Sequence, residues 1–255
     1  MDVTGIGNSY SSYSSYGKIA SGTRIQSASD GAAEMAIAEK QDAQARGYDV
    51  GVNNANQAKD MLNVADGALG NITDSIQRMR ELAMEASSGL LTDSDRGHIQ
   101  KEIDQLKQGI ADAANNTTFN TKALLNGDQS FSIATDAQGN SREMTTGNAT
   151  LHALGIADFD VTKGDFDIGV LDDAIDSLSS QRGSIGAQSN GLDFTVNFTS
   201  YASQNTVGAK SRIEDLDMET AISDQKKKEL LNTYAMMMKK RQQEEEANRA
   251  ARLFQ

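Results

Sequence analysis

The sequence predicts a mostly α-helical protein, an elongated antiparallel helical bundle or coiled-coil rod with a small β-hairpin region. Three observations lead to this fold class. Apolar residues recur in heptad steps over three separate stretches, proline is absent, and aromatic residues make up only 5% of the 255 residues. A core made of Ala, Leu, Ile, Val and Met suits long helices packed closely, and a lack of proline suits helices without sharp interior kinks.

The first heptad stretch extends from Ala58 to Ala86, where apolar residues follow one another in steps of four and three. This spacing places them on one stripe of a helix, and a stripe of four heptads needs a long helical partner. Besides four alanines, the stripe contains Leu62, Leu69, Ile72, Ile76 and Met79.

Two later stretches carry the same apolar step. The first contains Ile99, Ile103, Leu106 and Ile110, and the second contains Ile175, Leu178, Ile185 and Leu192. We therefore expect an early pair of helices and one late helix to pack lengthwise against one another.

Composition excludes several classes of function. Average usage of roughly 5% would give about a dozen prolines, and the chain has none, nor any tryptophan or cysteine. Without cysteine there are no disulfides, thiolate nucleophiles or Cys-ligated zinc sites. A net charge of -12 argues against a nucleic-acid partner. No apolar run is long enough for a transmembrane helix, so we expect no membrane partner.

The N-terminal 20 residues are rich in Ser, Tyr and Gly and lack the pattern of a general secretory signal. They indicate either a polar, partly disordered leader or a segment that orders on a partner. Ser29 or Asp30 is expected to cap a helix that starts near Gly31 or Ala32 and extends toward Ser88.

A second helix is predicted from Thr92–Ser94 to about Asn115, followed by a turn cluster at Asn115–Asn120. Beyond Leu125 glycine becomes frequent. Short strands are predicted at Phe131–Ile133 and within Leu151–Phe166, with a hairpin turn at Asp136–Asn140. The helical period returns at Asp167 and continues toward the end of the chain.

No residue pattern indicates catalysis, a cofactor or a metal. His98 and His152 lie in different segments, without a second ligand at metal-binding spacing. The aspartates from Asp158 to Asp176 match no register of a calcium loop. We therefore expect a protein that is not an enzyme. The tail combines Met236–Met238 with basic and acidic runs, which indicates either an exposed helix face or an adaptable interaction surface.

Several separate motifs resemble those of bacterial flagellins, and they occur in the order found in that family. The N-terminal motifs are Ile19–Asp30, Gln77–Ala86, Ile99–Ile103 and Thr118–Asn126. The C-terminal motifs are Ser180–Ala187 and Ser211–Asp215. The resemblance covers roughly residues 19–126 and 167–225, and identifies a short form without a large variable central domain and with divergent termini.

The resemblance implies the domain organisation. It divides the chain into an N-terminal polymer-core segment (1–30), N-terminal rod helices (31–126), a short β region (127–166), a C-terminal rod helix (167–219) and a C-terminal polymer-core helix (220–255).

The resemblance also implies a structural subunit that assembles with copies of itself into the helical tube of the bacterial flagellar filament, for motility. Such a subunit is extracellular and leaves the cell through the flagellar type III apparatus, with an export chaperone bound at its C-terminal segment. The alternatives are an accessory or hook-filament junction protein, or a secreted homologue that does not polymerise.

In flagellins, a patch on two facing helices is recognised by the flagellin-sensing Toll-like receptor of animal hosts. The resemblance places this patch, or an ordinary contact between subunits, at Gln77, Arg78, Glu81, Leu82 and Glu102. Leu82 falls beside the heptad stripe, which predicts a partly exposed side chain.

The terminal segments depart from the family pattern. The first residues are rich in Ser and Tyr, and Lys239–Arg252 is far more charged than the apolar heptads of flagellins. Because these segments form the polymer core in the family, we expect a polymer that is weaker than usual.

Overall fold

The computed structural model describes residues 15–253, and side chains up to Arg249. Residues 1–14 lie outside the described part, and with them most of the predicted polar leader. The chain forms two compact units. The central unit comprises Gln44–Gln204, and the terminal unit comprises the described residues up to Ala43 together with those from Asn205 onward.

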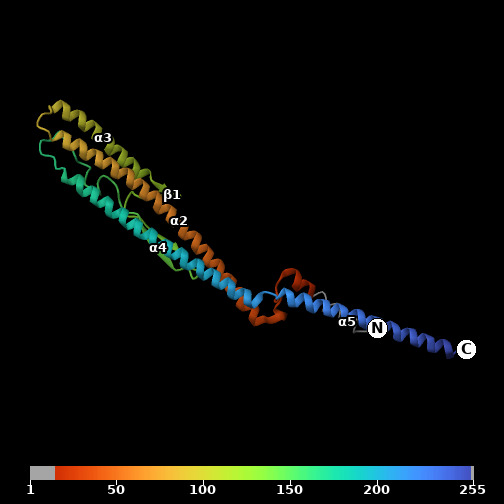
Figure 1. The fold of residues 1–255 in the computed structure, drawn as a ribbon. Helices are drawn as coiled ribbons and strands as arrows, with labels where there is room; N and C mark the ends of the chain where they lie inside the picture. Colours follow the sequence, from red (N-terminus) through yellow and green to blue (C-terminus); the bar gives the residue numbers. More distant parts are fainter. Residues whose placement is uncertain (1–14, 254–255) are drawn as a thin grey trace. The chain divides into compact units, whose positions relative to one another are not determined.

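The central unit is a bundle in which parts of two long helices and one complete helix lie side by side (Figure 1). These helices are α2 (Ala28–Ala86), α3 (Asp93–Asn116) and α4 (Gly169–Glu214). Their apolar stripes share one buried cluster with the β region. The predicted class, helices packed lengthwise with a small β region, is thereby confirmed.

The start of α3 is fixed by a reciprocal cap, close to the predicted position. The Asp95 backbone N–H donates to the Thr92 hydroxyl at 3.3 Å, and the Thr92 N–H donates to the Asp95 carboxylate at 3.0 Å. This capping box satisfies two backbone donors at the helix end. The hydrogen bonds from Thr92 also lower the pKa of Asp95.

The β region consists of two antiparallel pairs. Strand β1 (Thr118–Phe119) pairs with β2 (Lys122–Ala123), and β3 (Ser130–Ala134) pairs with β4 (Ser141–Thr145). The predicted turn between β3 and β4 is confirmed. The Asp136 carboxylate accepts hydrogen bonds from the backbone N–H groups of Gln138 and Asn140 at 3.0 and 2.8 Å, which closes the loop.

The strands predicted within Leu151–Phe166 are wrong, because this stretch forms successive turns. Its backbone bonds are local, with the Ile156 N–H donating to the Leu151 carbonyl at 3.1 Å. Lys107 on α3 holds the segment by donating to the Ala157 carbonyl at 2.5 Å. The alternation instead reflects a coil laid along the bundle with every second or third side chain buried; these are Leu154, Ile156, Phe159 and Val161.

Two glycines of α2 allow the β3–β4 turn to approach the helix closely. A Cβ atom at Gly47 would lie 2.8 Å from the Cβ of Ala137, and one at Gly51 would lie 2.5 Å from the Thr135 carbonyl oxygen. Only glycine leaves room for such a backbone contact. The helix continues through this glycine-containing stretch without a break.

In the terminal unit α2 includes a first turn from Ala28, and the uninterrupted helix follows Gly31, close to the predicted start near Gly31 or Ala32. Gly31 has non-helical angles (φ 163°, ψ 91°), so the helix is interrupted there. Asp30 does not cap the following turn as predicted. Its carboxylate faces backward and accepts from the N–H groups of Gln26 and Ser27 at 3.2 and 3.1 Å.

The terminal unit also contains α5 (Met218–Leu253). The segment before α5 is held by backbone contacts, since the Leu216 N–H donates to the Gly22 carbonyl and the Arg24 N–H donates to the Glu214 carbonyl. Among the helices of residues 15–253, none combines the length and apolar character needed to cross a membrane.

Candidate functional site

The heptad residues predicted from the sequence line the interior of the central unit. Leu62, Leu69, Ile72, Ile76 and Met79 of α2 have no exposed surface. The partner helices bury Ile103, Ile110, Leu178, Ile185 and Leu192, whereas Ile99, Leu106 and Ile175 are half-buried at the edge of the same cluster. The stripe thus joins α2, α3 and α4 into a single core.

Three ion pairs flank this core and connect α2 with α4. Lys59 contacts Asp193 at 2.6 Å, Asp66 contacts Arg182 at 2.8 Å, and Arg80 contacts Asp172 at 2.6 Å. Residue numbers rise on one helix as they fall on the other, so the pairs mark an antiparallel register. Exposed pairs of this kind add little stability, but a slip of one turn would break all three.

The predicted recognition patch is centred on Arg78. Its Nη2 lies 2.9 Å from Glu102 Oε1 on α3, and its Nη1 lies 3.0 Å from Glu81 Oε2 on the same helix. The hydrogen bonds to Glu81 and Glu102 raise the pKa of Arg78. Gln77 is exposed beside this pair. The structure thus brings Gln77, Arg78, Glu81 and Glu102 together on one α2–α3 surface.

Leu82 is the exception, and its predicted partial exposure is wrong. The side chain is 2% exposed and belongs to the central core. Because α3 and α4 both pack on α2, the buried face of α2 is wider than a single heptad stripe. Sequence spacing identified the stripe but not this widening. Leu82 therefore lies beneath the patch rather than in it.

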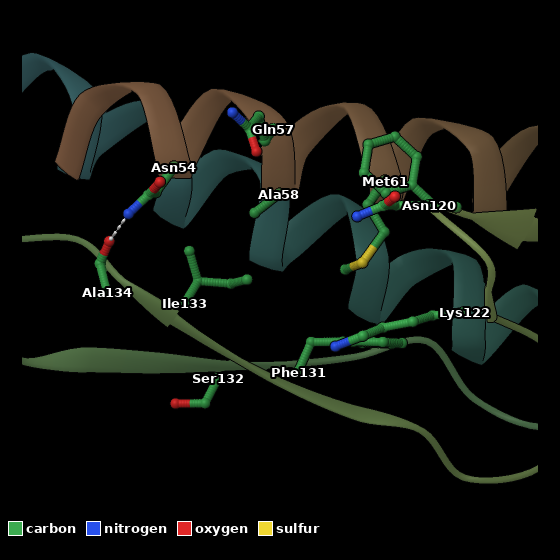
Figure 2. Close-up of a pocket in the computed structure, with 11 residues that line it drawn as sticks. Asn54, Gln57, Ala58, Met61, Asn120, Lys122, Phe131, Ser132, Ile133 and Ala134 are labelled. Atoms are coloured by element: carbon green, nitrogen blue, oxygen red, sulfur yellow. Dashed lines mark hydrogen bonds between the residues drawn. The ribbon is translucent and has the colours of Figure 1, made fainter. Parts of the chain in front are cut away.

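A groove of about 300 Å³ lies between α2 and β3 (Figure 2). The Asn54 amide spans the groove at one side, donating to the Ala134 carbonyl at 3.0 Å. At the other side Lys122 lies over the Phe131 ring, 5.8 Å from its centre. The apolar lining is provided by Ala58, Met61, Phe119, Phe131 and Ile133.

The groove contains no catalytic combination of side chains. Its lining residues include no histidine or carboxylate to act as a general acid or base. Within residues 15–253, no group of three His, Asp or Glu side chains is placed to hold a metal ion. The groove can offer shape, apolar contact and amide hydrogen bonds.

Large apolar side chains are exposed along α5 in the terminal unit. The most exposed of these among its described residues are Leu230, Leu231, Tyr234, Met236, Met237 and Met238, with between 43% and 72% of each residue exposed. The sequence indicated the methionines as a candidate surface. Exposed apolar side chains in such number are typical of a surface that another protein covers.

The sequence analysis missed two features of the central unit. One is the groove, because Asn54 and Gln57 carry no distinctive local signal. The other is an exposed aromatic row on α4, formed by Phe194, Phe198 and Tyr201. The spacing of four and three residues in this row, out of phase with Leu192 and Val196, would have revealed it.

Comparison with models of protein families shows to which family the chain belongs. The model for the bacterial flagellin N-terminal helical region matches residues 4–130, and that for the bacterial flagellin C-terminal helical region matches residues 168–247. The chain belongs to the bacterial flagellin family. The two matched regions contain the motifs that the sequence analysis assigned to this family.

Relatives of this flagellin match over most of their length. It is 33% identical to the flagellar filament 33 kDa core protein of Treponema phagedenis, with 84% of this chain and 82% of the relative covered. It is 34% identical to flagellin of Bacillus subtilis, with 88% and 87% covered.

Solved structures show the same fold. Bacillus cereus flagellin matches with 29% identity and a TM-score of 0.50, over 57% of this chain and 88% of that one. A putative flagellar hook-associated protein of Vibrio parahaemolyticus matches with 16% identity and a TM-score of 0.58, over 73% of this chain and 100% of that one. At 16% identity the likeness concerns the fold alone.

Proposed function

We propose that this flagellin is a structural subunit of the bacterial flagellar filament, without catalytic activity, that assembles with copies of itself outside the cell. The observation that carries the proposal is the match to both flagellin helical regions, together with a relative named as a filament core protein. The exposed apolar side chains of α5 support it, since they leave the terminal unit with surface for neighbouring copies to cover.

The physical basis of assembly is a contact between two different surfaces of the same chain. Such a heterologous contact repeats without closing and produces a helical filament. The five segments expected from the resemblance, 1–30, 31–126, 127–166, 167–219 and 220–255, provide the proposed division between polymer-core ends and the region between them. Leaving the cell through the flagellar type III apparatus belongs to the same proposal.

A second part of the proposal concerns recognition at Gln77, Arg78, Glu81 and Glu102, with Leu82 supporting them from below. This surface would contact a neighbouring subunit or the flagellin-sensing Toll-like receptor of an animal host. Arg78 is held by two carboxylates, so its guanidinium is already oriented, and arginine is a frequent anchor in protein interfaces. Arg78→Ala should weaken receptor binding to the monomer, whereas Arg80→Ala, which removes the neighbouring arginine, should not.

The exposed apolar row of α5 also fits a chaperone that covers it before export. Methionine side chains adapt readily to different partners, and Met236, Met237 and Met238 are exposed together. The export chaperone is therefore proposed to bind within residues 220–255.

Sedimentation of the purified chain, followed by electron microscopy, tests the main proposal. We expect helical filaments that dissociate more readily than those of Bacillus subtilis flagellin examined in parallel, because the exposed surface of α5 also carries Lys239, Lys240 and Arg241. Short caps or rings instead of filaments would indicate the accessory or junction role. A chain that stays monomeric at high concentration would contradict the proposal.

A further inference from the structure

We propose that the aromatic row on α4, formed by Phe194, Phe198 and Tyr201, is a contact surface for a second copy of this chain. All three residues belong to the central unit, and their exposed fractions are 73%, 64% and 67%. The inference rests on the proposed function and deepens it, by naming the surface at which one subunit meets the next.

The row does not belong to the core of its own molecule. Leu192, Val196 and Thr199 point from the same stretch of α4 toward the bundle. Phe194, Phe198 and Tyr201 are separated by four and three residues and form a second stripe on the outward side. A helix with two apolar stripes has two faces to cover, and the central unit covers only one of them.

The size of the row is that of a functional patch. Aromatic side chains bury 150–250 Å² each, so three of them at about two-thirds exposure present roughly 300–500 Å². The largest apolar patch on an ordinary monomer is about this size and is often functional. Aromatic residues are scarce in this chain, at 5% of the sequence, which makes three on one exposed stripe more unusual.

The distribution of charge indicates that the partner covering the aromatic row is another copy of this chain. Between Gly183 and Gln204 the helix itself carries one charged residue, Asp193, which pairs with Lys59 at 2.6 Å. The one charge shown to reach this stretch from β4 is Arg142, whose guanidinium donates to the Gly191 carbonyl and the Thr195 hydroxyl at 3.0 and 3.2 Å. The chain as a whole has a net charge of -12, so copies repel one another over most of their surface. This charge-poor stripe, which carries no unpaired carboxylate of its own helix, is where two acidic copies approach with the least repulsion. Depletion of charge combined with aromatic residues is also the composition of interface cores.

The absence of cysteine allows a direct test by site-specific labelling. Single variants Phe198→Cys and Val64→Cys are reacted with a maleimide before and after assembly. Val64 is an exposed apolar residue of α2, with Asp60 and Asp66 nearby in sequence, so it is a matched site outside the row. We expect assembly to slow labelling at position 198 by about tenfold or more, as for the centre of an interface, with little change at position 64.

A second variant measures the contribution of the row to assembly. Replacing Phe194, Phe198 and Tyr201 together by serine should raise the concentration needed for assembly by about tenfold or more, while Val64→Ser should leave it unchanged. Circular dichroism establishes that both variants fold; if the triple variant does not, the labelling result decides.

Equal labelling at position 198 in monomer and assembly would overturn the inference and leave the proposed function intact. Failure of the unmodified chain to assemble would overturn both.

Discussion

The central and terminal units use similar apolar residues in opposite ways. In the central unit Leu69, Ile72 and Ile76 have no exposed surface, whereas in the terminal unit Leu230 and Leu231 on α5 are 72% and 57% exposed. The buried apolar side chains of the terminal unit, among its described residues, are Ile25 and Ala38. One unit completes its core within the chain, and the other leaves apolar surface that a neighbouring molecule can cover.

The difference follows from what each segment has beside it. The α2 stripe is covered by α3, α4 and the turns of 151–166, so each heptad position meets a partner from the same chain. The described part of α5 has no comparable cover, and polar contacts such as those of Asp30 and Arg24 hold its unit together. We therefore expect the two units to respond differently to the same kind of substitution.

The largest difference is expected between Ile76→Ala and Leu230→Ala. Removing a fully buried side chain leaves a cavity, so Ile76→Ala should lower the free energy of unfolding by about 2–5 kcal/mol. Leu230→Ala should change it by less than about 0.5 kcal/mol in the monomer. Urea denaturation of both variants measures the free energy of unfolding. Equal losses in the two variants would contradict the view that the central unit completes its core within the chain while the terminal unit does not.

Comparing Gly51→Ala with Gly67→Ala should separate the effect of packing against the β3–β4 turn from the effect of helix propensity. The new Cβ would lie 2.5 Å from the Thr135 carbonyl oxygen, so the β3–β4 turn must move away, at a cost typical of overpacking, about 1–3 kcal/mol. Gly67→Ala is the matched control, since nothing lies within 4 Å of its Cβ. It should stabilise the helix by about 0.5–1 kcal/mol. Thermal melting should therefore show shifts of opposite sign; a stabilising Gly51→Ala would show that the turn does not pack on α2.

Asp30→Asn should reveal the polar character of the terminal unit. Hydrogen bonds from Lys18, Gln26 and Ser27 lower the pKa of Asp30 from 3.8 to about 2. A lowered pKa means that the stabilisation is present above pH 3.8 and is lost as the pH falls toward 2.

The unmodified chain should therefore melt at a higher temperature than the Asp30→Asn variant at pH 5, and this gap should narrow as the pH falls from 3.8 through about 2. A gap that is independent of pH would mean that the Asp30 charge does not matter. Ile76→Ala serves as the control, because no titrating group is removed and its deficit should persist when the pH is lowered from 5 to about 2.

The smallest effect is expected at the β1–β2 turn. Asn120 and Thr121 both have positive φ, 47° and 66°, as required by the two-residue turn that suits a hairpin. Asparagine tolerates this conformation, but a β-branched residue does not. Thr121→Gly should therefore stabilise the central unit by up to about 1 kcal/mol, and Asn120→Gly should do less. The Thr121 hydroxyl donates to the Asn120 carbonyl at 2.6 Å, so a loss of stability in Thr121→Gly would show that this hydrogen bond outweighs the backbone strain.

The sequence predicted those parts of the fold that depend on regular spacing. Heptad steps gave the helices and their lengthwise packing, and Asp136–Asn140 gave the hairpin turn. The alternation of apolar and polar residues within Leu151–Phe166 led to a wrong prediction of strands. A segment of turns on a helical surface can bury every second or third side chain without forming a β-ladder. The predicted partial exposure of Leu82 was wrong because its burial depends on how many helices pack on α2, and the spacing of residues within α2 does not contain this information.

The candidate surfaces were predictable to a lesser degree. The family motifs brought Arg78 and Glu102 to one patch although they lie 24 residues apart, and the structure joins them by an ion pair. The groove beside Asn54 could not be predicted, since it arises where α2, the β1–β2 turn and β3 meet. The aromatic row on α4 could have been found in the sequence, because its spacing is out of phase with Leu192 and Val196, but the sequence analysis followed only the stripe that contains Leu192.

Hydrogen exchange on the monomer and on the assembled form tests the central claim most directly. The account predicts slow exchange over 58–86 in both forms, because this part of α2 lies in a closed core, and fast exchange over 225–245 that slows strongly on assembly. Residues 225–245 exchanging slowly in the monomer, or equally fast in both forms, would contradict the claim that copies of the chain cover what the terminal unit leaves open.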